Sequence, residues 1–241
     1  MSDDLRSLIP RADQPLPTGE DKTRSVRAMF DVIAPRYDLV NRVMTFRMDV
    51  GWRRRTVGSL GLPPGSLVLD LACGTGDLAG ELADRHLVPV GADLSFGMLD
   101  AAARTFDRLQ CDGAALPVHD GCFDGATCGF ALRNFTDLDG TVAELARVVR
   151  HGGRVAVLEV AEPPNPVLRA GHAVYFGRVV PVIGGLLSDG SAYRYLPRSV
   201  AYLPPWPELR ATFERHGFRD AERTLLSGGI AQLLTATRDR S

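Results

Sequence analysis

The sequence is poor in cysteine, and its four thiols form no recognisable pair. Cys73, Cys111, Cys122 and Cys128 include no C-x-x-C spacing, and the five histidines show no ligand spacing either. Disulfide frameworks and zinc sites both depend on such spacings. We therefore expect reduced thiols, and we predict no metal site.

Long apolar runs and an excess of one charge are also missing. The formal net charge is -1 at pH 7, so the overall charge does not attract nucleic acid. No stretch reaches the roughly 18–20 consecutive apolar residues of a membrane-spanning helix. The first 21 residues lack the basic and apolar regions of a signal peptide. We therefore expect a cytoplasmic protein that binds no nucleic acid and touches a membrane at most peripherally.

What is present fits a single α/β domain. The 241 residues are 45% hydrophobic and 24% charged, which is ordinary globular usage and argues against disorder. Changes of pattern divide the chain into a flexible leader, a helical cap, a cofactor-binding core, a substrate lid, and a final helix with two strands. These parts are residues 1–21, 22–65, 66–160, 161–206 and 207–241.

Short apolar segments alternate with helical patterns through the core. This alternation predicts a doubly wound, mostly parallel sheet with helices on both faces, a Rossmann-like α/β fold. After residue 160 we expect a helix from Pro166 to Val180, and then an irregular segment that acts as a lid. The other expected helices after the cap are residues 77–85, 96–106, 138–149 and 207–216, the third ending at His151-Gly152-Gly153. The seven expected strands are residues 67–71, 88–92, 109–111, 125–130, 154–160, 218–225 and 230–237.

The segment DLACGTGD, which starts at Asp70, is the strongest motif. It follows an expected strand and opens a helix, where Gly74 and Gly76 let the backbone approach a ligand and free N–H groups are available. Thr75 adds a hydroxyl donor. Dinucleotide sites use a similar turn, but here the glycine order is A-x-G-x-G, and Asp70 would repel a pyrophosphate. The motif favours a methyltransferase over a nicotinamide-dependent reductase.

Three further strand ends carry residues suited to the same ligand. Asp93 lies roughly 20 residues beyond the turn, the distance at which a carboxylate accepts from ribose hydroxyls, although Asp93 or Ser95 would also serve as a helix N-cap. Asp112 with Gly113 is placed to recognise an adenine edge or to form a plain Asp-Gly turn. Gly129 is the last residue but one of the fourth expected strand. We predict that Asp93, Asp112, Gly113 and Gly129 bind the cofactor together with the glycine turn.

Several longer segments, from APRYDLVN through LRNFTD to SAYRYL, resemble one family of class I methyltransferases. That family comprises the menaquinone and ubiquinone biosynthesis C-methyltransferases, and the likeness extends over nearly the whole chain from Lys22. The glycine turn is common to many methyltransferases, whereas these three segments are specific to the family. The matching stretches are Met29–Phe46, Leu69–Ala79, Gly91–Leu99, Phe130–Asp137 and Val179–Val200.

The resemblance implies transfer of the S-adenosylmethionine methyl group to a ring carbon of demethylmenaquinol, a lipophilic quinol. Such a carbon is nucleophilic only when a neighbouring hydroxyl is nearly ionised, so a positive group must favour the phenolate. By resemblance, Arg133 and Asn134 orient a water and stabilise that oxyanion, and Tyr37 lies over the donor or the acceptor. Without the family, Arg133 would be interpreted as a surface ion pair with Asp137 or Asp139, and Tyr37 as a core aromatic.

Two other groups of residues are candidates for the acceptor and its membrane. Tyr193, Arg194 and Tyr195 are expected to shape the substrate entrance through their aromatic faces, with ordinary packing of the lid as an equal alternative. Arg53 to Arg55, beside Trp52, are candidates for contact with anionic lipid headgroups, although a solvated helix face is the more common arrangement. A homodimer is also left open.

Two segments depart from the family pattern, and both are expected on the acceptor side. They are Leu203–Trp206 and Ala231–Thr237. A related enzyme that methylates another quinol or a phenolic natural product is therefore an alternative. A noncatalytic module that only binds the donor is another.

Overall fold

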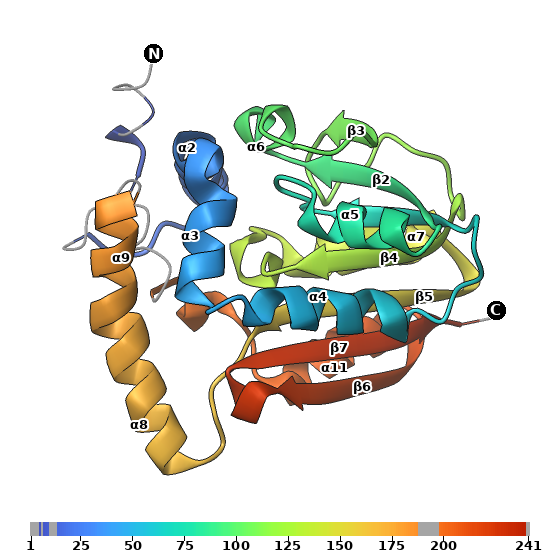
Figure 1. Ribbon diagram of the computed structural model, residues 1–241. Coiled ribbons are helices and arrows are strands. Elements are labelled where there is room, and N and C mark those ends of the chain that lie inside the picture. Colours follow the sequence, from blue (N-terminus) through green and yellow to red (C-terminus); the bar gives the residue numbers. More distant parts are fainter. Residues whose placement is uncertain (1–4, 6, 10–13, 188–197, 240–241) are drawn as a thin grey trace.

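A seven-stranded sheet lies at the centre of the molecule (Figure 1). The computed structural model describes residues 5, 7–9, 14–187 and 198–239. The strand order is β3-β2-β1-β4-β5-β7-β6; the first five strands are parallel, and β7 runs antiparallel to β5 and β6. The expected doubly wound, mostly parallel sheet is confirmed. The strands are β1 (Leu67–Leu71), β2 (Val88–Asp93), β3 (Asp107–Gln110), β4 (Phe123–Gly129), β5 (Val149–Val160), β6 (Phe218–Leu226) and β7 (Ala231–Arg238).

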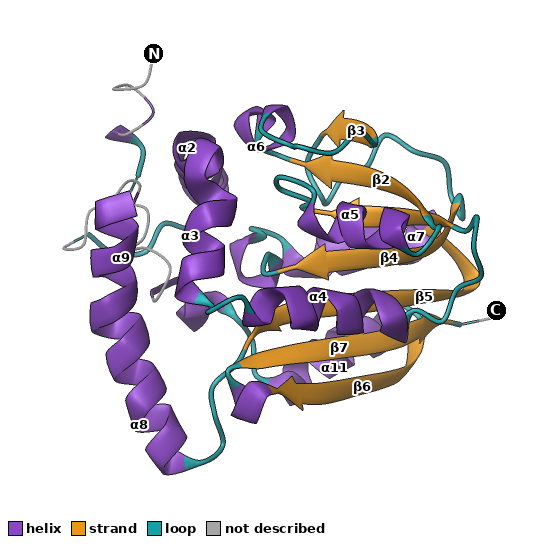
Figure 2. Cartoon of the chain, in the orientation of Figure 1, coloured by secondary structure: helices purple, strands orange, loops and turns teal. Residues whose placement is uncertain are grey.

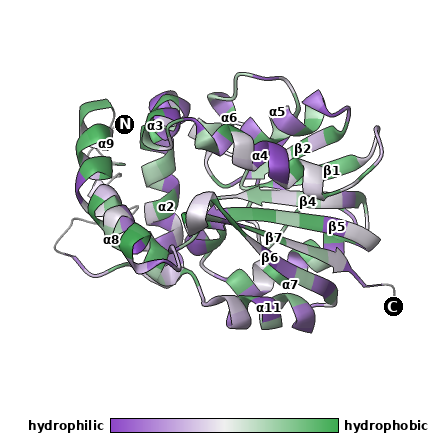
Figure 3. Ribbon diagram, turned by 60° about the horizontal axis from the view of Figure 1, so that its bottom comes forward, coloured by the Kyte–Doolittle hydropathy of each residue, from purple (hydrophilic) through white to green (hydrophobic). Residues whose placement is uncertain are grey.

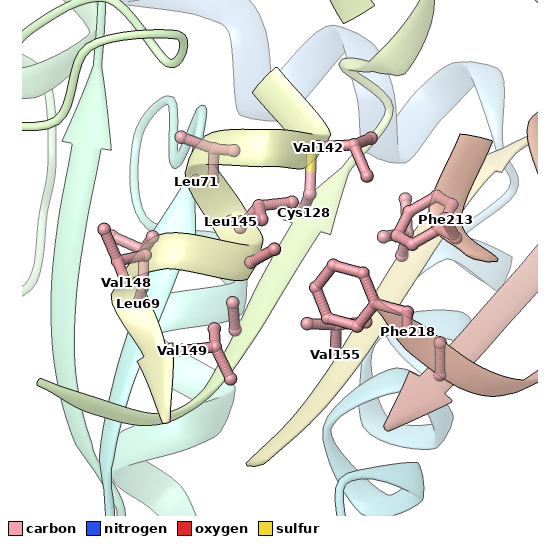
Figure 4. Packing of buried hydrophobic residues seen from close by; sticks show 14 of the residues in the cluster. Leu69, Leu71, Cys128, Val142, Leu145, Val148, Val149, Val155, Phe213 and Phe218 are labelled. Atoms are coloured by element: carbon pink, nitrogen blue, oxygen red, sulfur yellow. The ribbon is translucent and has the colours of Figure 1, made fainter. Parts of the chain in front are cut away.

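Helices cover both faces of the sheet (Figure 2). On one face, α4 and α5 bury Leu60, Leu78 and Leu82 against β1 and β5. On the other face, α7 and α11 contribute Leu145 and Phe213 to the larger apolar cluster (Figure 4). Burial on both faces explains why the central strands read as near-continuous apolar runs. These helices are α4 (Met48–Ser59), α5 (Asp77–Asp84), α7 (Leu138–Val148) and α11 (Trp206–Arg215).

The winding of the chain reverses beside β1, which has β2 on one side and β4 on the other. Leu71 at the end of β1 is in register with Ala92 and Cys128. The carboxyl ends of these three strands therefore meet at one edge. In doubly wound sheets this switch point is where ligands bind.

Two expected elements differ from the observed ones. Helix α6 (Phe96–Asp100) ends well before residue 106, and β5 begins at Val149, five residues before the expected start of that strand at Arg154. The Phe106 ring packs so closely against the glycine turn that a Cβ at Gly76 would lie 2.4 Å from it. Val149 pairs with Phe123 of β4. In both places a contact with a distant segment sets the end of the element.

The expected irregular lid is helical well beyond Val180. Helices α8 (Pro166–Val174) and α9 (Val180–Leu187) are joined by a π-helical turn, η3 (Tyr175–Val179). Pro181 has no N–H to donate to the preceding turn, and a wider turn just before it accommodates that loss. Residues 188–197, the middle of the family segment Val179–Val200, lie outside the described residues. The final part of the expected lid includes a short 3₁₀ turn, η4 (Val200–Tyr202).

The helical segment Pro166–Leu187 also bears on the expectation that no stretch is long and apolar enough to span a membrane. Within the described residues, Pro166–Leu187 is 22 residues long, with a mean hydropathy of 1.3 over its best window, so length and composition would allow it to cross a membrane. Two arginines and several glycines interrupt the run, which is why a count of consecutive apolar residues misses it. Figure 3 shows mostly apolar residues along α9.

The amino-terminal helices stand between the lid helix and the sheet (Figure 1). Helix α2 (Gly19–Ile33) starts three residues before the expected boundary at Lys22, and η1 (Ala34–Arg36) leads into α3 (Tyr37–Met44). Met29 and Ile33 of α2 form a cluster with Met98 of α6. This packing holds the cap over the carboxyl edge of the sheet.

Candidate functional site

The glycine turn after β1 adopts a backbone that few other residues tolerate. Ala72, Gly74 and Gly76 have φ values of +53°, +56° and +86°. The turn is fixed by the Cys73 N–H, which donates to the carbonyl of Ala92 over 3.1 Å. The left-handed conformation and the close contact with Phe106 together require glycine at position 76.

Asp70 supports this turn from below. Its carboxylate is fully buried and accepts from the Ala79 N–H (3.0 Å) and the Thr127 hydroxyl (2.9 Å). Burial raises the pKa of Asp70 to about 7, against the opposing effect of these hydrogen bonds. Asp70 does not line the cavity described next, so it acts on the turn rather than on that space.

A cavity of about 240 Å³ lies beyond the carboxyl ends of β1 to β4. We call it the donor-side cavity. Besides Tyr37 of the cap, it brings together six of the predicted site residues, which come from four different strand ends and the following loops. They are Gly74, Asp93, Asp112, Gly113, Gly129 and Asn134.

Asp93 connects the glycine turn to the next helix. One carboxylate oxygen accepts from the Gly74 N–H and the other from the Ser95 N–H, each over 2.8 Å. Ser95, not Asp93, is the N-cap of α6, because its hydroxyl accepts from the Met98 N–H. Burial raises the pKa of Asp93. Since each carboxylate oxygen has two lone pairs, both can still accept from a ligand.

Asp112 is both a turn residue and a residue of the cavity wall, the two roles considered from the sequence. Its side chain accepts from the Ala114 N–H over 3.0 Å, which makes it a turn residue, and it also lines the donor-side cavity. Gly113 lies beneath the Phe135 ring, with 3.0 Å between that ring and the place of a Cβ. The small residue keeps the cavity wall open at this point.

Thr75 and Gly76 face away from the donor-side cavity. The Thr75 hydroxyl donates to Asp38 of α3 over 2.5 Å. Thr75 does line a small space of about 40 Å³ between the glycine turn, Tyr37 and Phe130. The hydroxyl thus ties the cap to the turn.

Arg133 is buried rather than on the surface. It lies in a short 3₁₀ turn after β4, η2 (Leu132–Asn134), and pairs with the fully buried carboxylate of Glu159 on β5. Its Nε donates to the Ser199 hydroxyl over 3.1 Å. The surface ion pair considered from the sequence is wrong, because Asp137 caps α7 and Asp139 pairs with Arg215.

Asn134 is a buried residue of the site with one unsatisfied polar atom. The side chain is 9% exposed and lines the donor-side cavity. Its Oδ1 is buried and has no hydrogen-bond partner within the part of the chain that the structure describes. An unsatisfied buried polar atom costs free energy, so a ligand donor at this position would be stabilising.

A second cavity, of about 390 Å³, adjoins the first. We call it the acceptor-side cavity. Its wall is mostly apolar and includes Arg133, which does not line the donor-side cavity. Phe30, Tyr37 and Phe130 line both cavities and separate them. Burial raises the pKa of the Tyr37 phenol, so it stays protonated at neutral pH.

The sequence reasoning missed two polar residues of this region. Glu159, the partner of Arg133, is a lone carboxylate in the otherwise apolar run from Val155 to Val160, and that contrast was the available signal. His172 of α8 lines the acceptor-side cavity, and its buried Nε2 has no hydrogen-bond partner among the described residues. Burial lowers the pKa of His172, which favours the neutral ring. No spacing in the sequence pointed to it.

The basic run beside Trp52 is not a lipid-facing patch as a whole. Trp52 and Arg53 are buried, and Arg53 pairs with Asp49 and with Asp77. Arg54 and Arg55 are exposed. Arg53 instead joins α4 to the start of α5, directly behind the glycine turn. Tyr193, Arg194 and Tyr195 lie outside the described residues.

The two departures from the family pattern also lie elsewhere than expected. Trp206 begins α11 and, with Leu234 and Ala236 of β7, lines a separate small pocket. Strand β7 pairs with β5 and β6 along its length and is largely buried. Neither departure adds a side chain to the lining of the acceptor-side cavity.

Comparison with known proteins gives consistent matches. The sequence profile of the ubiE/COQ5 methyltransferase family matches residues 18–238. The chain is 40% identical over 224 residues to the ubiquinone/menaquinone biosynthesis C-methyltransferase UbiE of Syntrophotalea carbinolica, covering 89% of this chain and 94% of that one. It is 42% identical over 220 residues to the demethylmenaquinone methyltransferase of Thermus thermophilus, covering 87% and 100%.

Among solved structures, one similar fold belongs to phosphoethanolamine N-methyltransferase 2 of Haemonchus contortus in complex with S-adenosyl-L-methionine. The TM-score is 0.59 at 14% identity, over 78% of this chain and 52% of that chain. At this identity the likeness concerns the fold alone.

Proposed function

Because the chain belongs to the ubiE/COQ5 methyltransferase family and is an S-adenosylmethionine-dependent methyltransferase, we propose that it methylates a ring carbon of demethylmenaquinol. This substrate is the one named for the Thermus thermophilus relative. The observation that carries the proposal is the pair of adjoining cavities with Tyr37 between them. One cavity is lined at the strand ends by the carboxylates Asp93 and Asp112, and the other is mostly apolar.

The donor-side cavity fits S-adenosylmethionine by its chemistry. Asp93 would accept from the ribose hydroxyls, and Asp112 with Gly113 would recognise the adenine edge. Gly74 and Gly129 leave room for close approach of the ligand to the backbone. The free Oδ1 of Asn134 offers an acceptor to the donor or to a water. Asp70 and Thr75 act indirectly, by holding the turn.

The acceptor-side cavity would hold the quinol ring beside Tyr37. S-adenosylmethionine supplies an electrophilic methyl group, so a large part of the rate enhancement can come from alignment of the two reactants. Arg133 would stabilise the developing phenolate, although Glu159 shares its charge. His172 would hydrogen-bond a ring hydroxyl through Nε2. We propose Tyr37, Arg133 and Asn134 as the catalytic residues, and Tyr193, Arg194 and Tyr195 as part of the substrate entrance.

The partners follow from the same proposal. The acceptor is a lipophilic small molecule, which favours peripheral contact of a cytoplasmic enzyme with a membrane. We propose no nucleic-acid partner, in keeping with the net charge of -1. A homodimer is compatible with the proposal.

The test is a methyl-transfer assay read by mass spectrometry. Purified protein and S-adenosylmethionine are incubated with reduced short-chain demethylmenaquinol, and in parallel with a benzoquinol and a simple phenolic polyketide. We expect a mass gain of one methyl group on the naphthoquinol ring. If the protein binds the donor but methylates only the polyketide, demethylmenaquinol is not its acceptor. A phenolic natural product then becomes the proposed acceptor.

A further inference from the structure

The lid helix, Pro166–Leu187, presents an apolar face that nothing in the described chain covers. Only Val180 and Gly184 are buried along it. Val167 and Leu186, near its two ends, are 78% and 79% exposed. Helices of this length in a globular protein normally bury an apolar stripe. A large exposed apolar surface marks an interaction site.

The formal charges on this helix are all positive. From Pro163 to Leu187 the sequence contains no aspartate or glutamate. Arg178 makes no ion pair within the residues that the structure describes. Arg169 donates only to the carbonyls of Pro163 and Pro164, so its charge is not neutralised. Arg36, on the neighbouring segment, likewise donates to the Leu187 carbonyl. The surface therefore complements an apolar partner with an anionic rim.

The same helix forms one wall of the acceptor-side cavity. Val167 and Leu168 line that cavity and are also exposed, as is Phe46 at the end of α3. The Phe46 and Tyr175 rings lie 5.8 Å apart, and the Tyr175 hydroxyl donates to the Met44 carbonyl over 2.7 Å. The cavity is thus bounded by side chains that are also part of the exposed apolar surface.

We infer that the lid helix lies flat on an anionic phospholipid bilayer, with Val182 and Leu186 in the headgroup–acyl boundary and Arg178 among the phosphates. An amphipathic helix with cations and exposed aliphatic residues binds bilayers in this way. The inference rests on the proposed function in one respect, since a polyprenyl quinol dissolved in the bilayer would reach the acceptor-side cavity along this helix.

Two other arrangements fit the charges and contacts less well. A symmetric dimer through this face would bring the unpaired arginines of one copy against those of the other. A transmembrane orientation would break the contacts that fix the helix to the cap, which are the Arg36–Leu187 and Tyr175–Met44 hydrogen bonds. It would also place Arg178 inside the hydrocarbon region, which is costly.

The experiment is sedimentation of the full chain with vesicles of phosphatidylcholine containing about one third phosphatidylglycerol, and with phosphatidylcholine alone. We expect binding to the mixed vesicles that weakens with salt. The double variant Val182→Gln, Leu186→Gln should bind at least tenfold more weakly, because two exposed aliphatic groups no longer insert. Arg178→Gln should weaken binding to the anionic vesicles roughly fivefold. The matched control is Val88→Gln, which removes an exposed valine at the opposite end of the sheet and should bind like the wild type.

The outcomes separate this inference from the proposed function. All variants should methylate a short-chain quinol in vesicle-free buffer at wild-type rates, since none of the changed residues lines either cavity. Absence of vesicle binding by the wild type, or equal binding by the double variant, overturns the inference and leaves the proposed acceptor standing. The inference is also overturned if the wild type is a dimer that binds no lipid and the double variant is a monomer. Vesicle binding lost in the double variant supports the inference even where the quinol assay fails.

Discussion

At the scale of single residues, the site depends on buried charges whose partners are distant in the sequence. Arg133 meets Glu159 from the adjacent strand, and Asp70 is held by Thr127 and Ala79. Charges in such places are costly unless they are paired or hydrogen-bonded. Substitutions here change stability as well as activity, so each test needs a variant that separates the two.

Arg133→Ala should reduce the turnover number about 10²–10³-fold, since one group that stabilises the oxyanion is lost. Donor affinity should change little, because Arg133 does not line the donor-side cavity. The single variant also leaves Glu159 buried without its partner, which costs about 3–5 kcal/mol of folding free energy. Steady-state kinetics and denaturant unfolding measure both effects.

The control is the double variant Arg133→Ala, Glu159→Gln. A neutral glutamine can still accept from the Val160 N–H, so most of the lost stability should return while turnover stays low. If turnover recovered together with stability, Arg133 would have a structural role only.

Asp70→Asn should become more stable relative to the wild type as the pH rises. The pKa of Asp70 is about 7 in the folded protein, against 3.8 for an accessible aspartate. The folded state therefore binds the proton more tightly, and this contribution to stability is complete below about pH 4 and is lost as the pH rises through 7. Asparagine does not titrate and can make both hydrogen bonds.

Melting temperatures of the two proteins between pH 4 and 8 measure this difference. The change in relative stability across that range should not exceed about 4 kcal/mol, which corresponds to a shift of about three pKa units. A difference that is constant across the range would show that Asp70 does not titrate there.

At the scale of elements, the glycine turn and the helices around it are held by close contacts as well as by local preference. Gly76 has φ +86° and faces the Phe106 ring, whereas Gly51 lies within α4 with no atom near the place of a Cβ. The same substitution should therefore have opposite effects at these two positions.

Gly76→Ala should lower the free energy of unfolding by about 2 kcal/mol or more, because it adds both backbone strain and a steric clash. Gly51→Ala should raise it by about 0.5–1 kcal/mol through the better helix propensity of alanine. Urea unfolding of both variants is the measurement. Equal destabilisation by the two would contradict the strain at Gly76 and the free space at Gly51 from which the prediction is argued.

At the scale of the whole molecule, the donor-side cavity is assembled from four strand ends and the cap, so a bound donor links elements that are distant in the chain. S-adenosylmethionine at about 100 times its Kd should stabilise the native state by roughly 2.7 kcal/mol. For a domain of this size that corresponds to a rise in Tm of about 5–10 °C.

Differential scanning fluorimetry measures this rise, with NADH as the comparison ligand. NADH should leave Tm unchanged, and Asp93→Asn should reduce the response to the donor, because Asp93 lines the cavity. Stabilisation by NADH instead would contradict the assignment of the donor-side cavity.

The sequence by itself determined the order and type of most elements, the glycine turn, and which acidic residues follow which strands. These features depend on interactions over a few residues: apolar periodicity, turn chemistry and the fixed position of the carboxyl ends in a parallel sheet. For that reason the pattern of residues alone could assign Asp93, Asp112, Gly113 and Gly129 to one cavity.

Only the tertiary structure decided which charges are buried and which apolar surfaces are left open. Without the family resemblance, the pattern of residues predicts Arg53 and Arg133 alike as surface cations. In the structure each is buried beside a carboxylate partner, Asp49 or Glu159. The early end of α6 at Asp100 and the exposed lid helix also depend on contacts between distant segments. Burial and pairing are properties of residues brought together by folding, and a local pattern does not contain them.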